Sequence, residues 1–287
     1  MVVPGSSAQA DIRRRAIHEF ACNDCVLRKK LVDGRTKSDH DELSANPMKQ
    51  TLSFSWHGLS LQLDLDGALY WPEERLLVAA DLHLEKGTSY ASSAGRHLPP
   101  YDSAQTVARL ERLIEAYNPL RVVALGDSFH DRRGAARLDG DVAERIRRLS
   151  DRVDWIWIHG NHDPNPPRQL GGRGAVEIAI GPLVFRHDAH DERHAEGGEV
   201  IGHYHPVASV ATRGRSFRRR CFAIGTRRLL LPAFGAYAGG LNVREAAIRR
   251  LLDAEARVAL LGRDRLHLFP IAVTLPDPLH PAFEPAK

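Results

Sequence analysis

The spacing of apolar side chains from residue 50 onward predicts alternating strands and helices. Residues 101–119, "YDSAQTVARLERLIEAYNP", carry apolar side chains at helical spacing and end at a proline. Asp102, followed three residues later by a glutamine, is typical of a helix N-cap, so we expect Asp102 to cap this helix. The segment "LDGDVAERIRRL", residues 138–149, predicts a second helix with an apolar face.

Short continuous apolar runs predict strands that are buried on both faces. "RVVAL" and "VDWIWIH" are runs of this kind, and "ALYW" and "RLLVAA" are predicted to pair across a turn. After residue 175 the helical spacing fades and short strand-like runs follow one another. The pattern predicts an α/β first half and a mostly β second half, with packed sheets and helices outside them.

Residues 1–48 differ from this pattern, because they are charged and lack apolar periodicity. We expect them to form a disordered or loosely structured N-terminal extension. Residues 49–287 are predicted to form one domain, since 43% hydrophobic content supplies a full core.

Charge and hydropathy indicate where the protein acts and what kind of partner it binds. The formal charge is +4, from 40 basic and 36 acidic residues, and the isoelectric point near 9.1 suits a polyanionic partner. No window reaches the roughly 18 apolar residues of a membrane helix, and the first twenty residues lack the apolar core of a secretory signal. We therefore expect a cytoplasmic protein with no membrane partner.

The chain has three cysteines, which are too few for a disulfide framework. Cys22 and Cys25, in "CNDC", have the spacing of half a zinc site. No second pair completes the four ligands that zinc usually takes, so free surface thiols are the alternative.

Polar side chains follow three of the predicted strands. In chain order they are Asp81 and His83, then Asp127, then Asn161, His162 and Asp163. Asp81 and His83 are two residues apart, so on an extended chain they would point to the same side. Because ligands collect at the carboxyl ends of strands, we expect all of these groups to meet at one edge.

The second half of the chain adds three histidines after strand-like runs. The full set of plausible metal ligands is Asp81, His83, Asp127, Asn161, His187, His203 and His205. Carboxylate, imidazole and amide ligands suit divalent manganese, iron or zinc. Seven ligands are too many for one ion, but two ions bridged by one carboxylate would use them all. Asp127, central in the order, is the candidate bridge.

Each of these motifs alone has an ordinary explanation, such as a turn, a helix cap or a solvated histidine pair. Their order D-x-H, G-D-x-x-x-D, G-N-H-D, H, G-H-x-H resembles the calcineurin-like metallophosphoesterases. Within them, "LYWP", "ADLHLEKG", "GHYHP" and "LPAFGAYAGGLNV" resemble the ligase-associated DNA damage response endonucleases. The resemblance covers residues 50 to about 272.

The resemblance implies a four-layer αββα sandwich of the calcineurin-like metallophosphoesterase type and a site for two divalent metal ions. One metal would be held by Asp81, His83 and His205, the other by Asn161, His187 and His203, with Asp127 bridging them. We expect Mn²⁺, with Fe²⁺ or Zn²⁺ as alternatives. The two metals would hold a phosphate and supply a metal-bound hydroxide at neutral pH.

The resemblance also implies catalytic roles for two residues. His162 would give a proton to the leaving group, which suits an imidazole that titrates near neutrality, and Asp163 would orient His162. In "GDSFHD", His130 stands before Asp131 where the usual pattern is G-D-x-x-D-R. The roles of His130 and Asp131 therefore stay open.

Candidate substrate contacts come from a lysine and an arginine-rich segment. They are Lys86, Arg213, Arg215, Arg218, Arg219 and Arg220. Arginine binds phosphate well, although a solvated hairpin surface is the alternative for the segment, and a surface lysine is the alternative for Lys86. Phe129, Tyr204 and Tyr237 would stack on bases or pack in the core.

Three functions remain open from the sequence. The first is a metal-dependent phosphodiesterase or endonuclease that acts on DNA in repair, for which the resemblance implies a DNA ligase, a helicase and an exonuclease-like protein as partners. The second is a phosphodiesterase or phosphatase for a small molecule. The third is a scaffold of the same fold without catalysis, which the presence of both His162 and Asp127 disfavours.

Overall fold

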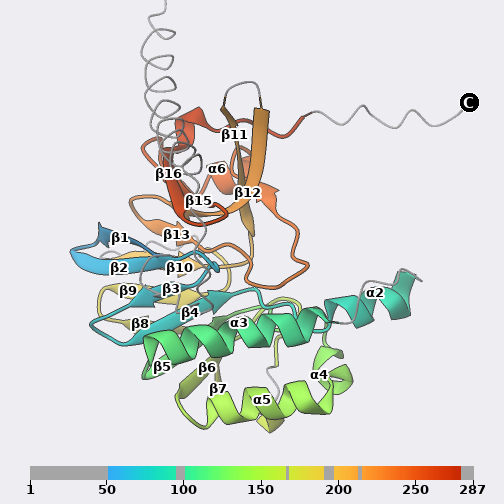
Figure 1. Ribbon diagram of the computed structural model, residues 1–287. Coiled ribbons are helices and arrows are strands. Elements are labelled where there is room, and N and C mark those ends of the chain that lie inside the picture. Colours follow the sequence, from blue (N-terminus) through green and yellow to red (C-terminus); the bar gives the residue numbers. More distant parts are fainter. Residues whose placement is uncertain (1–50, 95–100, 166–167, 191–196, 213–214, 279–287) are drawn as a thin grey trace, which may run out of the picture.

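The computed structural model describes residues 51–94, 101–165, 168–190, 197–212 and 215–278. The predicted extension 1–48 and the Cys22/Cys25 pair lie outside these residues. Two β-sheets pack face to face and helices cover the outer face of the first (Figure 1). None of the helices in the described ranges is long and apolar enough to cross a membrane.

The first sheet has seven strands in chain order, antiparallel up to the fourth and parallel from there. They are β1 (Thr51–Trp56), β2 (Leu59–Asp64), β3 (Leu69–Trp71), β4 (Leu76–Ala80), β5 (Arg121–Leu125), β6 (Asp154–Ile158) and β7 (Arg173–Ala175). The predicted pairing of "ALYW" with "RLLVAA" is confirmed as β3 with β4. Because β4, β5 and β6 run parallel, their carboxyl ends meet at one edge.

The second sheet is formed by the short strands of the second half. They are β8 (Glu177–Ile180), β9 (Leu183–Arg186), β10 (Gly198–Ile201), β11 (Pro206–Thr212), β12 (Arg215–Ile224), β13 (Arg228–Leu230), β14 (Leu241–Asn242), β15 (Arg257–Leu261) and β16 (Leu266–Pro270). Their order is β14-β11-β12-β13-β10-β9-β8, and β15 pairs with β12 and β16. β9 and β10 are parallel, so this sheet also brings two carboxyl ends together.

The helices lie mostly on one side. They are α2 (Lys86–Ala94), α3 (Asp102–Tyr117), α4 (Gly134–Arg137), α5 (Gly140–Ser150) and α6 (Ala246–Arg249), with 3-10 turns η2 (Arg168–Leu170) and η3 (Ile271–Val273). Figure 1 shows α3 and α5 along the first sheet and α6 beside the second. The four-layer αββα prediction is confirmed, although the helical layer on the second sheet is short.

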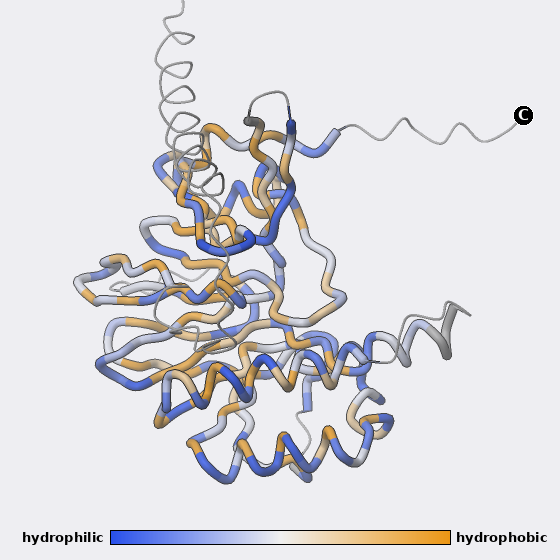
Figure 2. The backbone as a smooth tube through the Cα atoms, in the orientation of Figure 1, coloured by the Kyte–Doolittle hydropathy of each residue, from blue (hydrophilic) through white to orange (hydrophobic). Residues whose placement is uncertain are grey.

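Alternating burial along the strands explains the layers. In β4, Leu76 and Val78 face the other sheet, whereas Leu77 and Ala79 face α3 and α5. A third apolar cluster joins the second sheet to Ile248 of α6. Figure 2 shows apolar residues concentrated in the strands and polar residues along the outer sides of the helices. Each fully buried Leu or Ile contributes roughly 1.5–3 kcal/mol to folding, which holds the layers together.

The predicted N-cap role of Asp102 is wrong. The helix begins at Asp102, and Tyr101 occupies the capping position. The Asp102 carboxylate instead accepts a hydrogen bond from the Gly87 amide at 3.0 Å, near the first turn of α2. A carboxylate at a helix start stabilises the exposed amides there, so Asp102 caps the neighbouring helix rather than its own.

Candidate metal centre

The predicted ligands lie where strands of both sheets end. Asp81 follows β4, Asp127 lies two residues after β5, and Asn161 lies three residues after β6. From the second sheet, His187 follows β9 and His203 lies just after β10. The parallel strands of the two sheets therefore deliver their polar residues to one place, as expected from their positions in the sequence.

The chain is not extended at these residues, contrary to the expectation for the D-x-H and H-x-H pairs. Asp81 and His83 have φ angles of 53° and 42°, and His203 and His205 have 64° and 45°. Side chains two apart converge because both residues are left-handed, not because they alternate along a strand. Asp127, with φ of 42°, has the same conformation. Such angles are uncommon outside glycine and cluster at functional sites.

Backbone hydrogen bonds join the two loops that carry the aspartates. The His83 amide donates to the Asp127 carbonyl at 3.0 Å, and the Leu84 amide donates to the Ser128 carbonyl at 2.9 Å. The Asp81 carboxylate accepts a hydrogen bond from the His203 amide at 3.0 Å, which links the loop after β4 to the loop after β10. The ligand-bearing loops are therefore fixed to one another through the main chain.

Two glycines explain why the motifs contain glycine before the ligands. A Cβ on Gly126, whose φ is +74°, would lie 2.1 Å from Nδ1 of His187. A Cβ on Gly160 would lie 2.2 Å from Oδ1 of Asp127. Only glycine leaves room for the side chains of both ligands.

The first cluster contains Asp81, His83 and His205, whose ligand atoms lie within 4.8 Å of one another. The Nε2 atoms of the two histidines are 3.0 Å apart, and Nε2 of His205 lies 3.4 Å from Oδ1 of Asp81. Burial, and next the neighbouring His205, lower the pKa of His83 to about 2. Both effects favour the neutral imidazole, which is the form that binds metal ions.

The second cluster contains Asp127, His187 and His203, again within 4.8 Å. Nε2 of His187 lies 3.4 Å from Oδ2 of Asp127 and 3.2 Å from Nδ1 of His203. The Asn161 side-chain oxygen lies 2.9 Å from Nε2 of His187 and 3.0 Å from Nδ1 of His203. Asn161 thus joins this cluster. Nδ1 of His187 also lies 3.7 Å from Oδ1 of Asp81, so the second cluster is next to the first cluster.

The donor set fits divalent cations. Asp81 is fully buried and Asp127 is 2% exposed, so their negative charges need a positive partner nearby. Burial acts to lower the pKa of His187, but the hydrogen bond to Asp127 and the charge of Asp81 outweigh it and raise this pKa to about 9. For Asp127, burial is likewise outweighed by His187, and its pKa falls to about 2. Carboxylate, imidazole and amide groups suit manganese, iron or zinc.

His162 lies at the edge of the second cluster. Its amide donates to Oδ1 of Asp127 at 2.9 Å, and its Nε2 lies 3.8 Å from Oδ2 of Asp127. Its Nδ1 lies 2.7 Å from the His130 carbonyl. The side chain is 40% exposed, so a substrate can reach the ring.

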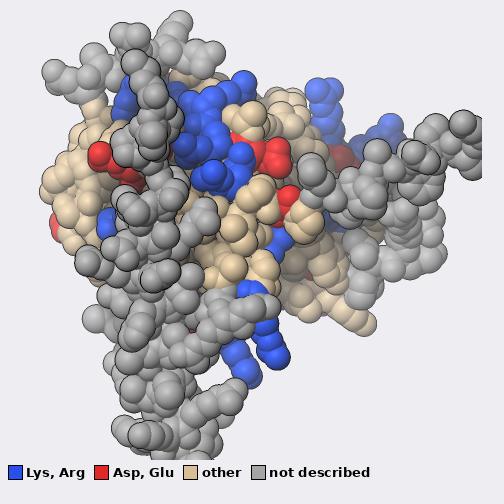
Figure 3. Space-filling model, turned by 90° about the horizontal axis from the view of Figure 1, so that it is seen from above, with Lys and Arg blue, Asp and Glu red and all other residues tan. Residues whose placement is uncertain are grey.

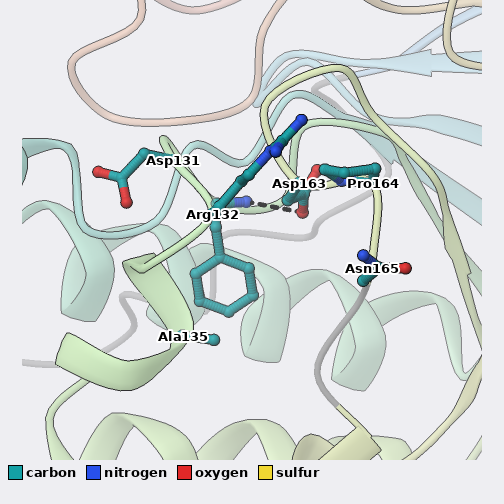
Figure 4. Close-up of a pocket in the computed structure, with 7 residues that line it drawn as sticks. Asp131, Arg132, Ala135, Asp163, Pro164 and Asn165 are labelled. Carbon is teal, nitrogen blue, oxygen red and sulfur yellow. Dashed lines mark hydrogen bonds between the residues drawn. The ribbon is translucent and has the colours of Figure 1, made fainter.

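The structure corrects the expected contact between Asp163 and His162. The Asp163 carboxylate is buried and accepts a hydrogen bond from the Phe129 amide at 3.0 Å, drawn as the dashed line in Figure 4. The His130 carbonyl, not Asp163, accepts the hydrogen bond from the His162 ring. Burial raises the pKa of Asp163 to about 7. Asp163 acts on the loop after β5, which carries Asp127 and His130.

The inserted residues of "GDSFHD" have different surroundings. Asp131 forms a bidentate ion pair with Arg137 of α4, with contacts of 3.0 and 2.6 Å, and so holds the loop. His130 stacks between the rings of Tyr90 and His162. The extra histidine is visible in the sequence, but its contacts depend on α2, which is far away along the chain.

Lys86 lines the same depression as the ligands His203 and His205. This depression, of about 590 Å³, also contains Asp188, Tyr204 and Arg250. Sequence reasoning missed Arg250, because a single arginine at the end of a short helix carries no pattern.

Of the three aromatic candidates, Phe129 packs in the core, Tyr204 donates to Asp188 at 2.6 Å, and Tyr237 is half-buried before β14.

The predicted arginines divide into two kinds. Arg215, Arg218 and Arg219 are exposed on β12, whereas Arg220 is half-buried and donates to the Ala233 carbonyl at 2.6 Å. Among the exposed ones, Arg218 forms an ion pair with Asp277 at 3.1 Å and Arg219 donates to the Arg218 carbonyl at 3.1 Å. Arg213 lies outside the described residues.

Comparisons with known proteins agree with this geometry. The family model of calcineurin-like phosphoesterases matches residues 74–213. The crystal structure of Pseudomonas putida nuclease MPE is 30% identical with a TM-score of 0.61, covering 77% of this chain and 100% of that chain. Yfce, a phosphoesterase from E. coli, has 16% identity and a TM-score of 0.38, and the match covers 68% of this chain and 98% of that chain. A search of curated proteins gave no match.

Candidate metal ligands at the strand ends of two packed sheets fit a metallophosphoesterase. The chain belongs to the calcineurin-like phosphoesterase family, as its motifs predict, and is a hydrolase of phosphoric esters.

Proposed function

We propose that the protein is a phosphodiesterase that cleaves DNA as an endonuclease, using two divalent metal ions, with Mn²⁺ as the working metal. The observation that carries the proposal is the adjacency of two ligand clusters, one around Asp81 and one around Asp127. The similarity to a nuclease supports a nucleic-acid substrate.

The residues would divide the work as follows. Asp81, His83 and His205 would hold one ion, and Asn161, His187 and His203 the other, with Asp127 between them. Bound there, the ions would neutralise the phosphate and lower the pKa of water. In its doubly protonated form, His162 would give the proton on Nε2 to the leaving oxygen, since the hydrogen on Nδ1 stays bonded to a carbonyl that can only accept.

The DNA substrate is supported by a second depression beside the first. It is lined by Arg218, Arg219 and Arg220 and shares Gly239 and Gly240 with the depression that contains the ligand histidines. Figure 3 shows basic side chains gathered on the face seen from above, with a few carboxylates beside them. A strand of DNA crossing Gly239 and Gly240 would have phosphates near both the metals and the arginines.

A small-molecule phosphodiesterase is the second candidate, and one observation favours it. Arg218, Arg219 and Arg220 each donate a hydrogen bond within the protein, which occupies part of the donor capacity that DNA phosphates would need. The same metal site would then serve a smaller ester without the arginines.

The proposal extends to a cellular setting. We propose that residues 49–287 act as one catalytic domain in the cytoplasm, in DNA repair alongside a ligase, a helicase and an exonuclease-like protein. Residues 1–48 would form a separate extension. Co-purification of the full chain and of residues 49–287 with these enzymes tests both points, since a partner bound through the extension would be lost from the shorter chain.

The test of the function uses circular single-stranded DNA, because a circle has no ends for an exonuclease. Metal-stripped protein is incubated with Mn²⁺, the circle and a chromogenic phosphodiester, with Asp127→Asn as control. Cleavage of both substrates by the wild type alone supports the endonuclease. Hydrolysis of the small ester with an intact circle would contradict it and favour the second candidate.

A further inference from the structure

Three aromatic rings lie in succession between α2 and the metal site: Tyr90, His130 and His162. The centroids of Tyr90 and His130 are 5.6 Å apart with an interplanar angle of 20°. Those of His130 and His162 are 5.5 Å apart at 24°. The rings are nearly parallel, and His130 is the middle one.

His162 needs support, because its side chain is 40% exposed. Exposed side chains change rotamer within picoseconds to nanoseconds, and most rotamers would turn Nε2 away from Asp127. The edge-on contact with His83, at 5.4 Å and 88°, restricts one side of the ring. The stacked His130 ring restricts a face.

His130 acts on His162 through two different groups. Its carbonyl accepts a hydrogen bond from Nδ1 of His162 at 2.7 Å, so the hydrogen on Nδ1 is held there and the second hydrogen of the protonated ring lies on Nε2, which faces Asp127. Its side chain packs on the same imidazole. The main chain therefore occupies Nδ1, which leaves Nε2 of the protonated ring as the donor, and the side chain holds the orientation.

We propose that His130 is a positioning residue for His162, and that Tyr90, which stacks on the His130 ring, supports it. The inference rests on the proposed proton-donor role of His162. It assigns a purpose to the histidine that is inserted in "GDSFHD": the ring keeps Nε2 aimed at the leaving oxygen. Loss of the ring should therefore lower the rate of hydrolysis most for esters whose leaving group needs a proton.

The test compares two small diesters, so it does not depend on DNA cleavage. One is a nitrophenyl diester, whose leaving group needs little protonation, and the other is a dinucleoside monophosphate, whose alkoxide needs much. We expect His130→Ala to lower kcat on the dinucleotide about 10- to 100-fold, with an unchanged KM, and to change the nitrophenyl rate by less than about threefold. His130→Phe keeps a flat ring and the carbonyl, so it restores most of the dinucleotide rate.

Controls separate positioning from damage to the fold. His57→Ala removes an exposed histidine on the turn after β1 and leaves both rates unchanged. Metal content and melting temperature of His130→Ala should match the wild type. In the metal-free protein, nitrogen NMR should show His162 in one ring orientation in the wild type and in several in His130→Ala.

Equal losses on both esters, or no recovery with His130→Phe, overturn the proposal. Tyr90→Ala is the second variant, and it should give a smaller loss on the dinucleotide alone. A wild type that hydrolyses both diesters but leaves a DNA circle intact refutes the DNA substrate and not the role of His130.

Discussion

The metal-ligand edge and the arginine strand β12 are both dense in charged or polar residues, but their side chains have different surroundings. At the edge, buried Asp81 and Asp127 are held by hydrogen bonds from the main chain and by neighbouring histidines. On β12, Arg215 and Arg219 are exposed, and Arg218 is bound to Asp277. The side chains at the metal-ligand edge are therefore fixed in position, whereas the positive charge on β12 is exposed and partly neutralised by neighbouring groups.

This difference predicts that substitutions at the edge affect all substrates, and that substitutions on β12 affect only long polyanions. Small changes in position matter at a site whose groups act together, but exposed charges act additively and are screened by salt.

The largest effect is expected from the first ligand cluster. His205→Ala removes one of three ligands, and we expect rates on DNA and on the nitrophenyl diester to fall together, by about 100-fold or more. Steady-state kinetics and metal analysis measure the two losses. A variant that keeps its metal and its rate would show that His205 is not a ligand.

His162→Ala should have the next largest effect. Metal content stays the same, and the rate on a poor leaving group falls about 100-fold, because proton donation is lost. The rate on the nitrophenyl diester changes much less. Equal rates on the poor leaving group before and after substitution would remove the proton-donor role.

A smaller effect is expected on β12. Arg219→Ala should weaken binding of single-stranded DNA several-fold and reduce the slope of log affinity against log salt by about 0.7, the loss of one phosphate contact. Arg148→Ala is the matched control, since Arg148 is exposed on α5 and pairs with Glu144. The same change in both variants would show a general charge effect and not a DNA path.

The smallest effect concerns the ion pair that neutralises Arg218. Asp277→Asn removes the negative charge beside this arginine, which keeps its hydrogen bond to the Gly240 carbonyl, so DNA binding should tighten about two- to threefold, with no change on the small ester. The hydrogen bond from Arg218 lowers the pKa of Asp277. Its contribution to stability is therefore present above the ordinary aspartate pKa and lost as the pH falls through the lowered value.

Thermal melting across pH tests this sign. The variant should melt slightly below the wild type near neutrality, and the two curves should converge in acid. A gap that widens in acid would contradict the assignment.

The sequence predicted the layers because burial sets the pattern directly. A strand covered on both faces, such as β4, must be apolar throughout, and the polar residue that follows marks its end. The candidate ligands were singled out in this way, and the structure brings them together in two clusters, whereas metal binding by them stays a prediction. Roles that depend on contacts between distant segments were not: Asp163 was expected at His162 but binds the Phe129 amide, and Asp102 caps α2.

The arginine segment shows the same limit of prediction from sequence, because its charges were evident but their partners were not. Its charge was evident, but the partner of Arg218 is Asp277, 59 residues away, and only the fold brings the two together. The φ angles at Asp81 and His83 were also unpredicted, since spacing alone suggested an extended strand.

The residues in the left-handed conformation affect how substitutions in this chain would change its stability and its activity. The left-handed conformation costs a non-glycine residue about 1 kcal/mol or more, and the protein adopts it at Asp81, His83, Asp127, His203 and His205. Glycine at any of them would relieve the cost and remove a ligand. The same conformation occurs at His57, Arg75, Glu85 and Asn118, so a laboratory selection for heat resistance that ignored activity would draw on all nine positions, and those of its variants that lost a candidate ligand would be more stable and inactive.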